Sequence, residues 1–188
     1  VENDLLVAVG DLVDRGPQNL ECIELLGQSW FTSIRGNHED LCINGLGNDS
    51  FKRCHIDNGG EWFYQIDELA QLNIAKVLQE LPVVLEVNHQ GKKYGFVHGH
   101  IEQNDWEEFK ATFTPGFKGY KAAQNAMWGR DRLNIDDHKY TTVSGVDAVF
   151  IGHTVVQHVC HRDNCYFIDI GSCFVGRLAV LDVNGLGL

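Results

Sequence analysis

Residues 5–16, LLVAVGDLVDRG, decide the first part of the fold, because an apolar segment of strand length runs directly into a polar cluster. Pro17 follows at a position suited to the first turn of a helix, and apolar residues then recur at helical spacing. A second apolar segment, residues 30–34, ends in the polar cluster RGNHE at residues 35–39, and a helix is predicted from there to about Leu46. Strand, helix, strand, helix is the order of a parallel α/β layer.

The remainder of the chain alternates short helices and strands. Helices are predicted over residues 59–66, 68–81, 106–111 and 121–128. Strands are predicted over residues 83–87, 94–97, 148–151, 155–160, 166–170 and 178–183. We expect the last four strands to form a β-meander, and residues 1–188 to form one domain with its own core.

Composition and charge exclude several classes of protein. Hydrophobic residues make up 44% of the chain and charged residues 22%, which is ordinary for a soluble globular protein. The formal net charge of −11 argues against nucleic-acid binding, which needs clustered Lys and Arg. No apolar run approaches the roughly 20 residues that span a bilayer, so no membrane partner is expected. The same negative charge repels a phosphate anion, so a phosphate site here must be made locally positive.

The cysteines indicate a reducing compartment. Six cysteines are scattered along the chain without a C-x-x-C pair, as is typical of reduced thiols in a cytoplasmic protein. A disulfide between Cys160 and Cys165, across a hairpin, is the alternative. A secretory leader pattern is not found at the N-terminus. The sequence specifies no oligomeric state.

Four of the predicted strands are followed, within a few residues, by a side chain that can bind a metal. These side chains are Asp11, Asn37, His98 and His153. Ligands of α/β sheets bind beyond the carboxyl ends of the strands. Taken singly, the aspartate is more simply a helix cap, the asparagine a turn residue and each histidine a satisfied core residue. Taken together, the four residues are more economically explained by one site.

The ligand types indicate which metals would bind. Oxygen and imidazole ligands without a thiolate suit manganese, iron or zinc, and they differ from a closed structural zinc site. An aspartate that can bridge fits a two-metal centre with ions roughly 3.5–4 Å apart. Such a pair lowers the pKa of a bridging water and clamps the phosphoryl oxygens during in-line attack. We therefore expect two divalent transition-metal ions, manganese first, with iron or zinc as alternatives.

Three further residues have the chemistry that hydrolysis of a phosphomonoester needs. His38 can act as the general acid for the leaving oxygen, and a carboxylate such as Asp14 can orient its ring. Arg15 can bind the non-bridging oxygens in a bidentate manner. A plain surface ion pair before a helix explains Asp14 and Arg15 equally well without this context.

Together these motifs resemble a known family. The motif G-D-x-x-D-R-G at residues 10–16, R-G-N-H-E at 35–39, the strand-ending His98 and G-H-T at 152–154 are similar to PPP phosphoprotein phosphatases of the calcineurin-like metallophosphoesterase superfamily. Residues 5–46 are especially similar to the bacterial and phage members of lambda type.

The resemblance continues through Asn58-Gly59-Gly60 and residues 128–133, and it implies a fold and a set of roles. The implied fold is an α/β sandwich of two mixed β-sheets flanked by helices. The implied second phosphate-binding arginine is Arg130, which composition alone does not distinguish from Arg132. The implied metal ligands are Asp11, bridging both ions, with Asn37, His98 and His153 at the second ion, and the implied acid is His38 partnered by Asp14.

The chain departs from the family pattern in two places. Relatives carry a D-x-H motif on a strand before Asp11, and it supplies the other ligands of the first metal. No D-x-H on a predicted strand of the chain replaces it, so we expect an N-terminally incomplete domain that lacks its first strand. The second departure is His98-Gly99-His100, where we interpret His100 as incidental to the site.

Three functions from two classes follow as hypotheses. The leading one is hydrolysis of phosphomonoesters on Ser and Thr, with Tyr as a further candidate, in phosphoprotein substrates. The second is symmetrical cleavage of diadenosine tetraphosphate, since those hydrolases share the metal motifs. The third is a non-catalytic metal-binding module. Turnover of phosphopeptides or of the dinucleotide separates the three.

Overall fold

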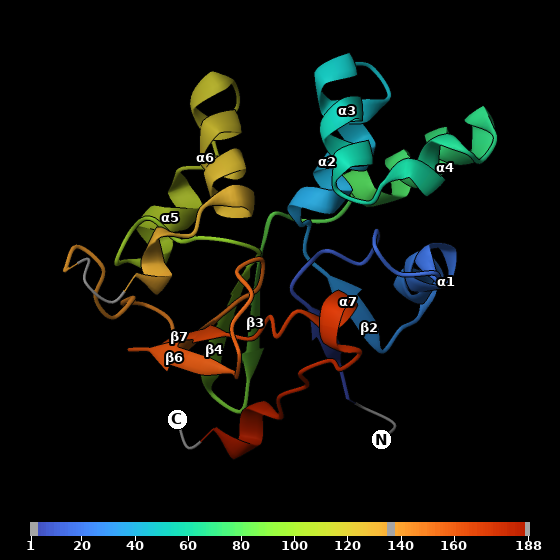
Figure 1. The fold of residues 1–188 in the computed structure, drawn as a ribbon. Coiled ribbons are helices and arrows are strands. Elements are labelled where there is room, and N and C mark those ends of the chain that lie inside the picture. The colour runs from blue at the N-terminus through green and yellow to red at the C-terminus, as the bar shows by residue number, and fades with distance from the viewer. Residues whose placement is uncertain (1–3, 135–137, 187–188) are drawn as a thin grey trace. The chain divides into compact units, whose positions relative to one another are not determined.

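The computed structural model describes residues 4–134 and 138–186, and the chain divides into two compact units, residues 1–82 and 83–188 (Figure 1). Each unit has a sheet of its own, two-stranded in the first and five-stranded in the second. The predicted α/β class is confirmed, with the difference that the smaller sheet is parallel and only the larger one is mixed. The interpretation of residues 1–188 as one domain stays a prediction.

The first unit begins with the predicted order of strand, helix, strand and helix. Its two strands pair in parallel, with Leu6 opposite Phe31 and Ala8 opposite Ser33. The elements of this unit are β1 (Leu6–Ala8), α1 (Asn19–Glu24), η1 (Leu25–Gly27), β2 (Phe31–Ser33), α2 (Asn37–Gly45), α3 (Asp49–Asp57), η2 (Glu61–Tyr64) and α4 (Glu68–Gln79).

Helix α3 is not among the predicted helices. Most of its residues are polar, and the apolar ones, Phe51, Cys54 and Ile56, are too few to predict a helix. Its start is instead stabilised by Asn48, whose side-chain oxygen accepts hydrogen bonds from the backbone N–H groups of Ser50 and Phe51 at 2.9 and 3.3 Å. The helix buries His55 completely. The core of the unit lies beside it and contains Val13, Cys42, Phe63, Ile74, Leu78 and Leu81.

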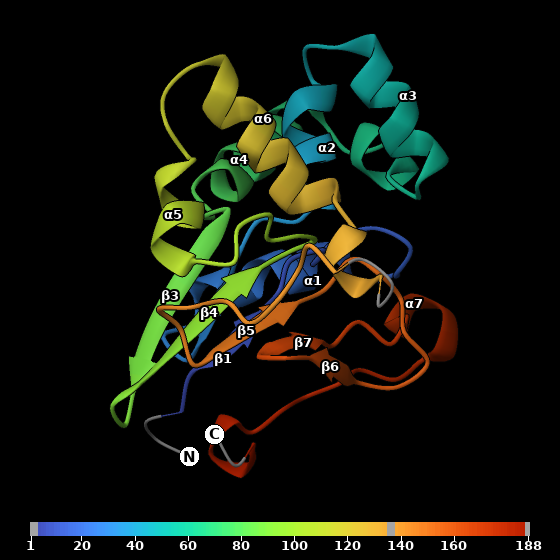
Figure 2. The ribbon, with the colours of Figure 1, turned by 90° about the vertical axis from the view of Figure 1, so that its left-hand side faces the viewer.

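The second unit is built on a mixed sheet with the order β3-β4-β5-β7-β6. Figure 2 shows β3, β4 and β5 side by side, with α5 and α6 above them in that view. Helix α5 packs closely on β4, because a Cβ atom at Gly95 would lie 2.6 Å from the buried ring of Trp106. The elements are β3 (Val84–His89), β4 (Lys92–Val97), α5 (Trp106–Ala111), α6 (Phe117–Trp128), η3 (Asp131–Leu133), β5 (Ala148–Ile151), β6 (Cys160–Arg162), β7 (Cys165–Phe167), α7 (Ser172–Val175) and η4 (Val183–Gly185).

The predicted C-terminal β-meander is wrong. Strand β6 is the outermost strand of this sheet and pairs with β7, to which it is antiparallel. Strand β7 therefore lies between β5 and β6 and runs parallel to β5. Residues 155–159 precede β6 as irregular chain, and Val155 is half exposed. Residues 178–182 form no strand either, and Leu178 and Val180 are exposed. Apolar composition without a neighbouring ladder is insufficient for a strand.

Two predictions from composition can be compared with the structure. None of the helices within residues 4–134 and 138–186 is long and apolar enough to cross a bilayer. The six cysteines are free thiols. The alternative disulfide between Cys160 and Cys165 does not form, because the register of β6 and β7 places Cys165 opposite Arg162 and Cys160 opposite Phe167.

Candidate active site

In the first unit, the parallel pairing of β1 and β2 brings two of the predicted metal ligands to one sheet edge. Asp11 lies three residues beyond β1, and Asn37 starts α2, four residues beyond β2. The backbone N–H of His38 donates to Asp11 Oδ1 at 3.2 Å, which joins the two motifs directly. A Cβ atom at Gly36 would lie 2.3 Å from the same oxygen, so only glycine leaves room for the Asp11 carboxylate against this turn.

Glu39 joins the Asp11 motif to the Asn37 motif, a role that was not among those predicted from the sequence. Its carboxylate accepts backbone hydrogen bonds from Asp11 at 2.9 Å, Leu12 at 2.7 Å and Gly36 at 2.7 Å, and its side chain is completely buried. A glutamate three residues after the residue that precedes a helix is a signature of an N-terminal cap, and this signal is present in R-G-N-H-E.

The predicted pair of His38 and Asp14 is formed within this unit. His38 Nδ1 lies 2.6 Å from Asp14 Oδ2, and the exposed fractions of the two side chains are 3% and 0%. The second ring nitrogen, Nε2, lies 3.9 Å from Asp11 Oδ2, beyond hydrogen-bonding distance. Nδ1 is therefore the nitrogen held by the carboxylate, and Nε2 is the one directed toward the metal-ligand aspartate.

Hydrogen bonding shifts the pKa values of both members of this pair. Burial by itself raises the pKa of Asp14, but hydrogen bonds from His38, His55 and Trp62 outweigh it and hold that pKa below its ordinary value. Burial likewise lowers the pKa of His38, but the hydrogen bond to Asp14 and the charge of Asp11 outweigh it, so the pKa of His38 is raised. The geometry thus favours an imidazolium facing an ionised carboxylate, which is the form a general acid requires.

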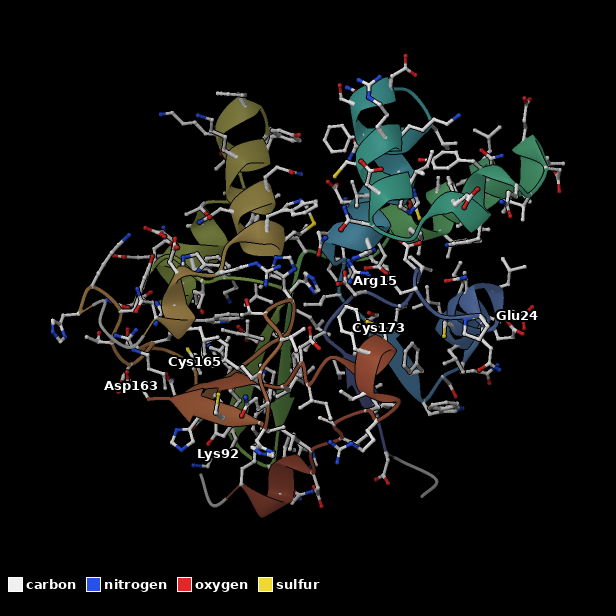
Figure 3. The ribbon with its side chains drawn as sticks, in the orientation of Figure 1. Arg15, Glu24, Lys92, Asp163, Cys165 and Cys173 are labelled. Carbon is white, nitrogen blue, oxygen red and sulfur yellow. The ribbon has the colours of Figure 1, made fainter. Side chains whose placement is uncertain are left out.

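Arg15 follows Asp14 on the loop that joins β1 to α1, and Figure 3 labels it. Its Nη2 donates to Asn58 Oδ1 at 3.2 Å. Asp14 and Arg15 both have a positive φ, 76° and 62°, which is uncommon for residues other than glycine. Non-glycine residues in this region persist where surrounding contacts hold them, and they concentrate at functional sites.

In the second unit, parallel pairing brings the two predicted histidine ligands to one edge. Val97 at the end of β4 lies opposite Ile151 at the end of β5, and the Gly152 N–H donates to the carbonyl of His98 at 2.8 Å. The imidazole rings of His98 and His153 lie with their centroids 5.0 Å apart at 59°, and both side chains are buried. The sequence prediction that these two residues share a sheet edge agrees with this geometry.

The structure also distinguishes Arg130 from Arg132. Arg130 is exposed, and its Nη1 donates to the carbonyl of His153 at 2.9 Å and to Thr154 Oγ1 at 3.1 Å. Arg132 is 2% exposed and is occupied with structural contacts. Its guanidinium donates to the carbonyls of Ile101, Gln103 and Thr141 and to Asn104 Oδ1. Arg130 is thus the arginine of the two that can reach a ligand.

His100 belongs to a buried polar cluster in the second unit. Its Nε2 lies 2.9 Å from Glu102 Oε2 and 3.3 Å from the hydroxyl of Tyr140. Burial lowers the pKa of His100 despite the carboxylate of Glu102. These contacts agree with the interpretation that His100 is incidental to the metal site.

The donor set suits the metals expected from the sequence. The first unit presents a carboxylate and an amide at one sheet edge, and the second presents two adjacent imidazoles at another. Oxygen and imidazole donors without thiolate suit divalent manganese, iron or zinc. Each pair is placed within its own unit, so convergence of residues 11, 37, 98 and 153 on one cation stays a prediction.

Comparison with known proteins agrees with this chemistry. The family model described as calcineurin-like phosphoesterase matches residues 1–157. The chain belongs to this family. A serine/threonine-protein phosphatase 1 of Salmonella typhimurium is 32% identical over 182 residues, which cover 95% of this chain and 78% of that protein. A serine/threonine-protein phosphatase 2 of Escherichia coli is 29% identical over 184 residues, which cover 94% and 78%.

The fold has a solved counterpart. A structure of a candidate diadenosine tetraphosphatase has a TM-score of 0.57 and 16% identity, and the match covers 91% of this chain and 72% of that one. This likeness concerns the fold alone. The predicted family and fold class are therefore confirmed: the chain is a PPP-type member of the metallophosphoesterase hydrolases, a family that uses divalent metal ions.

Proposed function

We propose that this chain is a metal-dependent phosphoprotein phosphatase that hydrolyses phosphomonoesters on Ser and Thr. The observation that carries the proposal is the 2.6 Å contact between His38 and Asp14, formed directly beside Asp11 and Asn37. The names of the two enterobacterial relatives favour a protein substrate.

The predicted site residues would have three separate roles in this reaction: metal binding, phosphate binding and proton donation. Asp11, Asn37, His98 and His153 would hold two divalent ions, manganese first and iron or zinc as alternatives. Such ions, when bound, lower the pKa of a coordinated water and offset the charge of the phosphoryl oxygens. Arg15 and Arg130 orient the phosphate, since a guanidinium matches its oxygens in a bidentate manner. His38 delivers a proton from Nε2 to the leaving serine or threonine oxygen, and Asp14 fixes the ring through Nδ1.

Proton donation matters most for an alkyl leaving group. The alkoxide of Ser or Thr is a far stronger base than a nitrophenolate, so its departure depends on the acid at His38. We expect His38→Asn to lower kcat on a phosphoserine peptide by roughly 10²–10⁴-fold, with a smaller loss on p-nitrophenyl phosphate and unchanged metal content. Equal rates of the variant and the wild type on the peptide would contradict the role of His38.

A substrate panel tests the function itself. The full-length protein with Mn²⁺ would be assayed on phosphoserine, phosphothreonine and phosphotyrosine peptides and on diadenosine tetraphosphate. Turnover of the serine and threonine peptides is the expected result. Turnover of the dinucleotide alone would replace the proposal with a diadenosine tetraphosphate hydrolase. Metal binding without turnover of any substrate in any divalent metal would indicate a non-catalytic module.

A further inference from the structure

We propose that residues 55–62, the end of α3 and the turn into η2, position the acid pair and the phosphate arginine of this site. His55 and Trp62 hold the Asp14 carboxylate, and Asn58 with Gly59 holds Arg15. We call residues 55–62 the positioning segment. The inference rests on the proposed function of His38, Asp14 and Arg15, and none of the residues of the segment is assigned contact with substrate.

The Asp14 carboxylate is held from several sides by donors distant in sequence. Trp62 Nε1 donates to Oδ1 at 2.7 Å, and His55 Nε2 lies 3.2 Å from Oδ1 and 3.0 Å from Oδ2. Oδ2 also binds His38 Nδ1 at 2.6 Å. Because the tryptophan and His38 bind opposite oxygens, a rotation that moves Oδ2 away from His38 also breaks the bond from Trp62. The carboxylate therefore has one orientation, and that orientation aims the ring of His38.

His55 is itself fixed in the orientation that this role needs. Its Nδ1 lies 3.0 Å from the hydroxyl of Tyr64, so the two ring nitrogens have separate partners and Nε2 is left to donate to Asp14. The ring packs directly on the backbone of Gly60, where a Cβ atom would lie 1.9 Å from His55 Cδ2. Gly60, the third residue of Asn58-Gly59-Gly60, must therefore be glycine, because a side chain there would clash with the imidazole ring of His55.

A metal site formed by Asp14, Cys42 and His55 is the main alternative for this cluster, since their ligand atoms lie within 4.8 Å of one another. Cys42 Sγ lies 3.5 Å from His55 Nε2, within hydrogen-bonding distance for sulfur, and burial raises the pKa of this thiol. The carboxylate is also occupied by the indole N–H of Trp62, which is a donor only. A hydrogen-bonded cluster explains these contacts better than a cation does.

The same turn supports the neighbouring Arg15. Asn58 Nδ2 donates to the carbonyl of Cys54 at 2.9 Å, which directs Oδ1 toward the guanidinium of Arg15. Gly59 has a φ of +100°, and a Cβ atom there would lie 2.9 Å from Arg15 Cγ. One short segment therefore holds two consecutive residues whose positive φ values need external contacts.

Two tryptophan variants test whether the hydrogen bond from Trp62 positions the Asp14 carboxylate. Trp62→Phe removes the indole donor and keeps an aromatic ring. Trp106→Phe is the matched control, because Trp106 Nε1 also donates to a carboxylate at 2.7 Å, that of Glu86 in the second unit. We expect Trp62→Phe to lower kcat on a phosphoserine peptide about tenfold and on p-nitrophenyl phosphate less than about threefold, because a misplaced acid penalises the more basic leaving group. Trp106→Phe should leave the ratio of the two rates unchanged.

A spectroscopic readout keeps this test independent of catalysis. The Nδ1 and Nε2 chemical shifts of His38, measured on the zinc-loaded protein and assigned by their loss in His38→Asn, report how the ring is bonded. We expect Trp62→Phe to move the Nδ1 shift and Trp106→Phe to leave it in place. If the wild type hydrolyses no phosphomonoester, the proposed function fails, and these shifts still decide whether Trp62 positions the ring. An unmoved shift together with equal losses on both substrates would overturn the proposal and leave Trp62 a structural residue.

A pair of asparagine variants tests the hold on Arg15. Asn58→Ala removes the contact with Arg15, and Asn44→Ala is its control, because Asn44 Nδ2 likewise donates to the carbonyl four residues earlier, at 3.0 Å. We expect Asn58→Ala to raise KM for the phosphopeptide several-fold with little change in kcat, and Asn44→Ala to change neither. Equal KM values for Asn58→Ala and the wild type would overturn this half of the proposal.

Discussion

Replacing Glu39 by Gln should weaken the hydrogen bonds that join the motif of Asp11 to the motif of Asn37, without removing a predicted metal ligand. In the wild type, Glu39 Oε2 accepts from the backbone N–H groups of Asp11 and Gly36, and Oε1 accepts from that of Leu12. A glutamine has one oxygen for these three donors, and its amide nitrogen must face the remaining N–H group. The substitution preserves the size of the side chain, so the change in stability reports hydrogen bonding and charge.

The size of the effect follows from these contacts. Hydrogen bonds to a charged group contribute about 1.5–3 kcal/mol each, and neutral ones about 0.5–1.5 kcal/mol. Glutamine weakens two bonds of Glu39, loses the third and leaves the part-buried N–H group of Leu12 without its acceptor. We expect the free energy of unfolding to fall by about 3 kcal/mol. Because the hydrogen bond to the Asp11 backbone weakens and that to its neighbour Leu12 is lost, metal affinity should also fall about 10–100-fold.

Urea unfolding followed by circular dichroism measures the first quantity, and titration of metal-free protein with Mn²⁺ measures the second. Glu24→Gln is the control, because Glu24 is an exposed residue of α1, labelled in Figure 3. A Glu39→Gln protein as stable as this control, with unchanged affinity for Mn²⁺, would refute the reasoning that the carboxylate joins the motifs.

Three further perturbations follow from the structure. Asp11→Asn should remove bound metal along with activity, and elemental analysis of the purified variant checks this. Arg132→Met should lower the free energy of unfolding by more than about 3 kcal/mol, because the buried guanidinium of Arg132 bonds three backbone carbonyls that would lose their donor. Arg130→Lys should instead chiefly raise KM, and the opposite pattern would reverse the two roles. Burial raises the pKa of Glu102, but hydrogen bonds, that from Lys139 foremost, outweigh it and lower the pKa from 4.5 to about 2. Since the pKa of Glu102 is lower in the folded state than in the unfolded state, its stabilisation of the fold is complete above about pH 5 and is lost as the pH falls toward 2. The urea midpoints of the wild type and Glu102→Gln should therefore converge on acidification.

The sequence located the ligand-bearing strand ends with fair accuracy because the signal there is local. An apolar segment followed by a polar cluster marks a strand and its carboxyl end at once, as in Leu6–Ala8 before Asp11 and in Ala148–Ile151 before His153. The sequence also identified His38 and Asp14 as a pair, since their motifs have a characteristic order. Parallel pairing of β1 with β2 then followed from the alternation of strands and helices.

The order of strands at the C-terminus depended on tertiary structure. Strand β7 lies beside β5 because β6 takes the edge of the sheet, and apolar patterns do not specify which of two short strands lies inside. Residues 178–182 have the composition of a strand and have none of its pairing. A ladder is a property of two segments, so one segment alone cannot predict it.

The partners that complete the site were also decided only by the fold. His55 and Trp62 reach Asp14 from 41 and 48 residues away, and His55 does so from a short, mostly polar helix that Asn48 caps. Arg132, which composition does not distinguish from Arg130, is buried and bonds backbone carbonyls. The sequence by itself determined which chemical groups are present and at which strand ends they stand. The tertiary structure decided which hydrogen-bond partners orient them, because those partners depend on how distant segments pack.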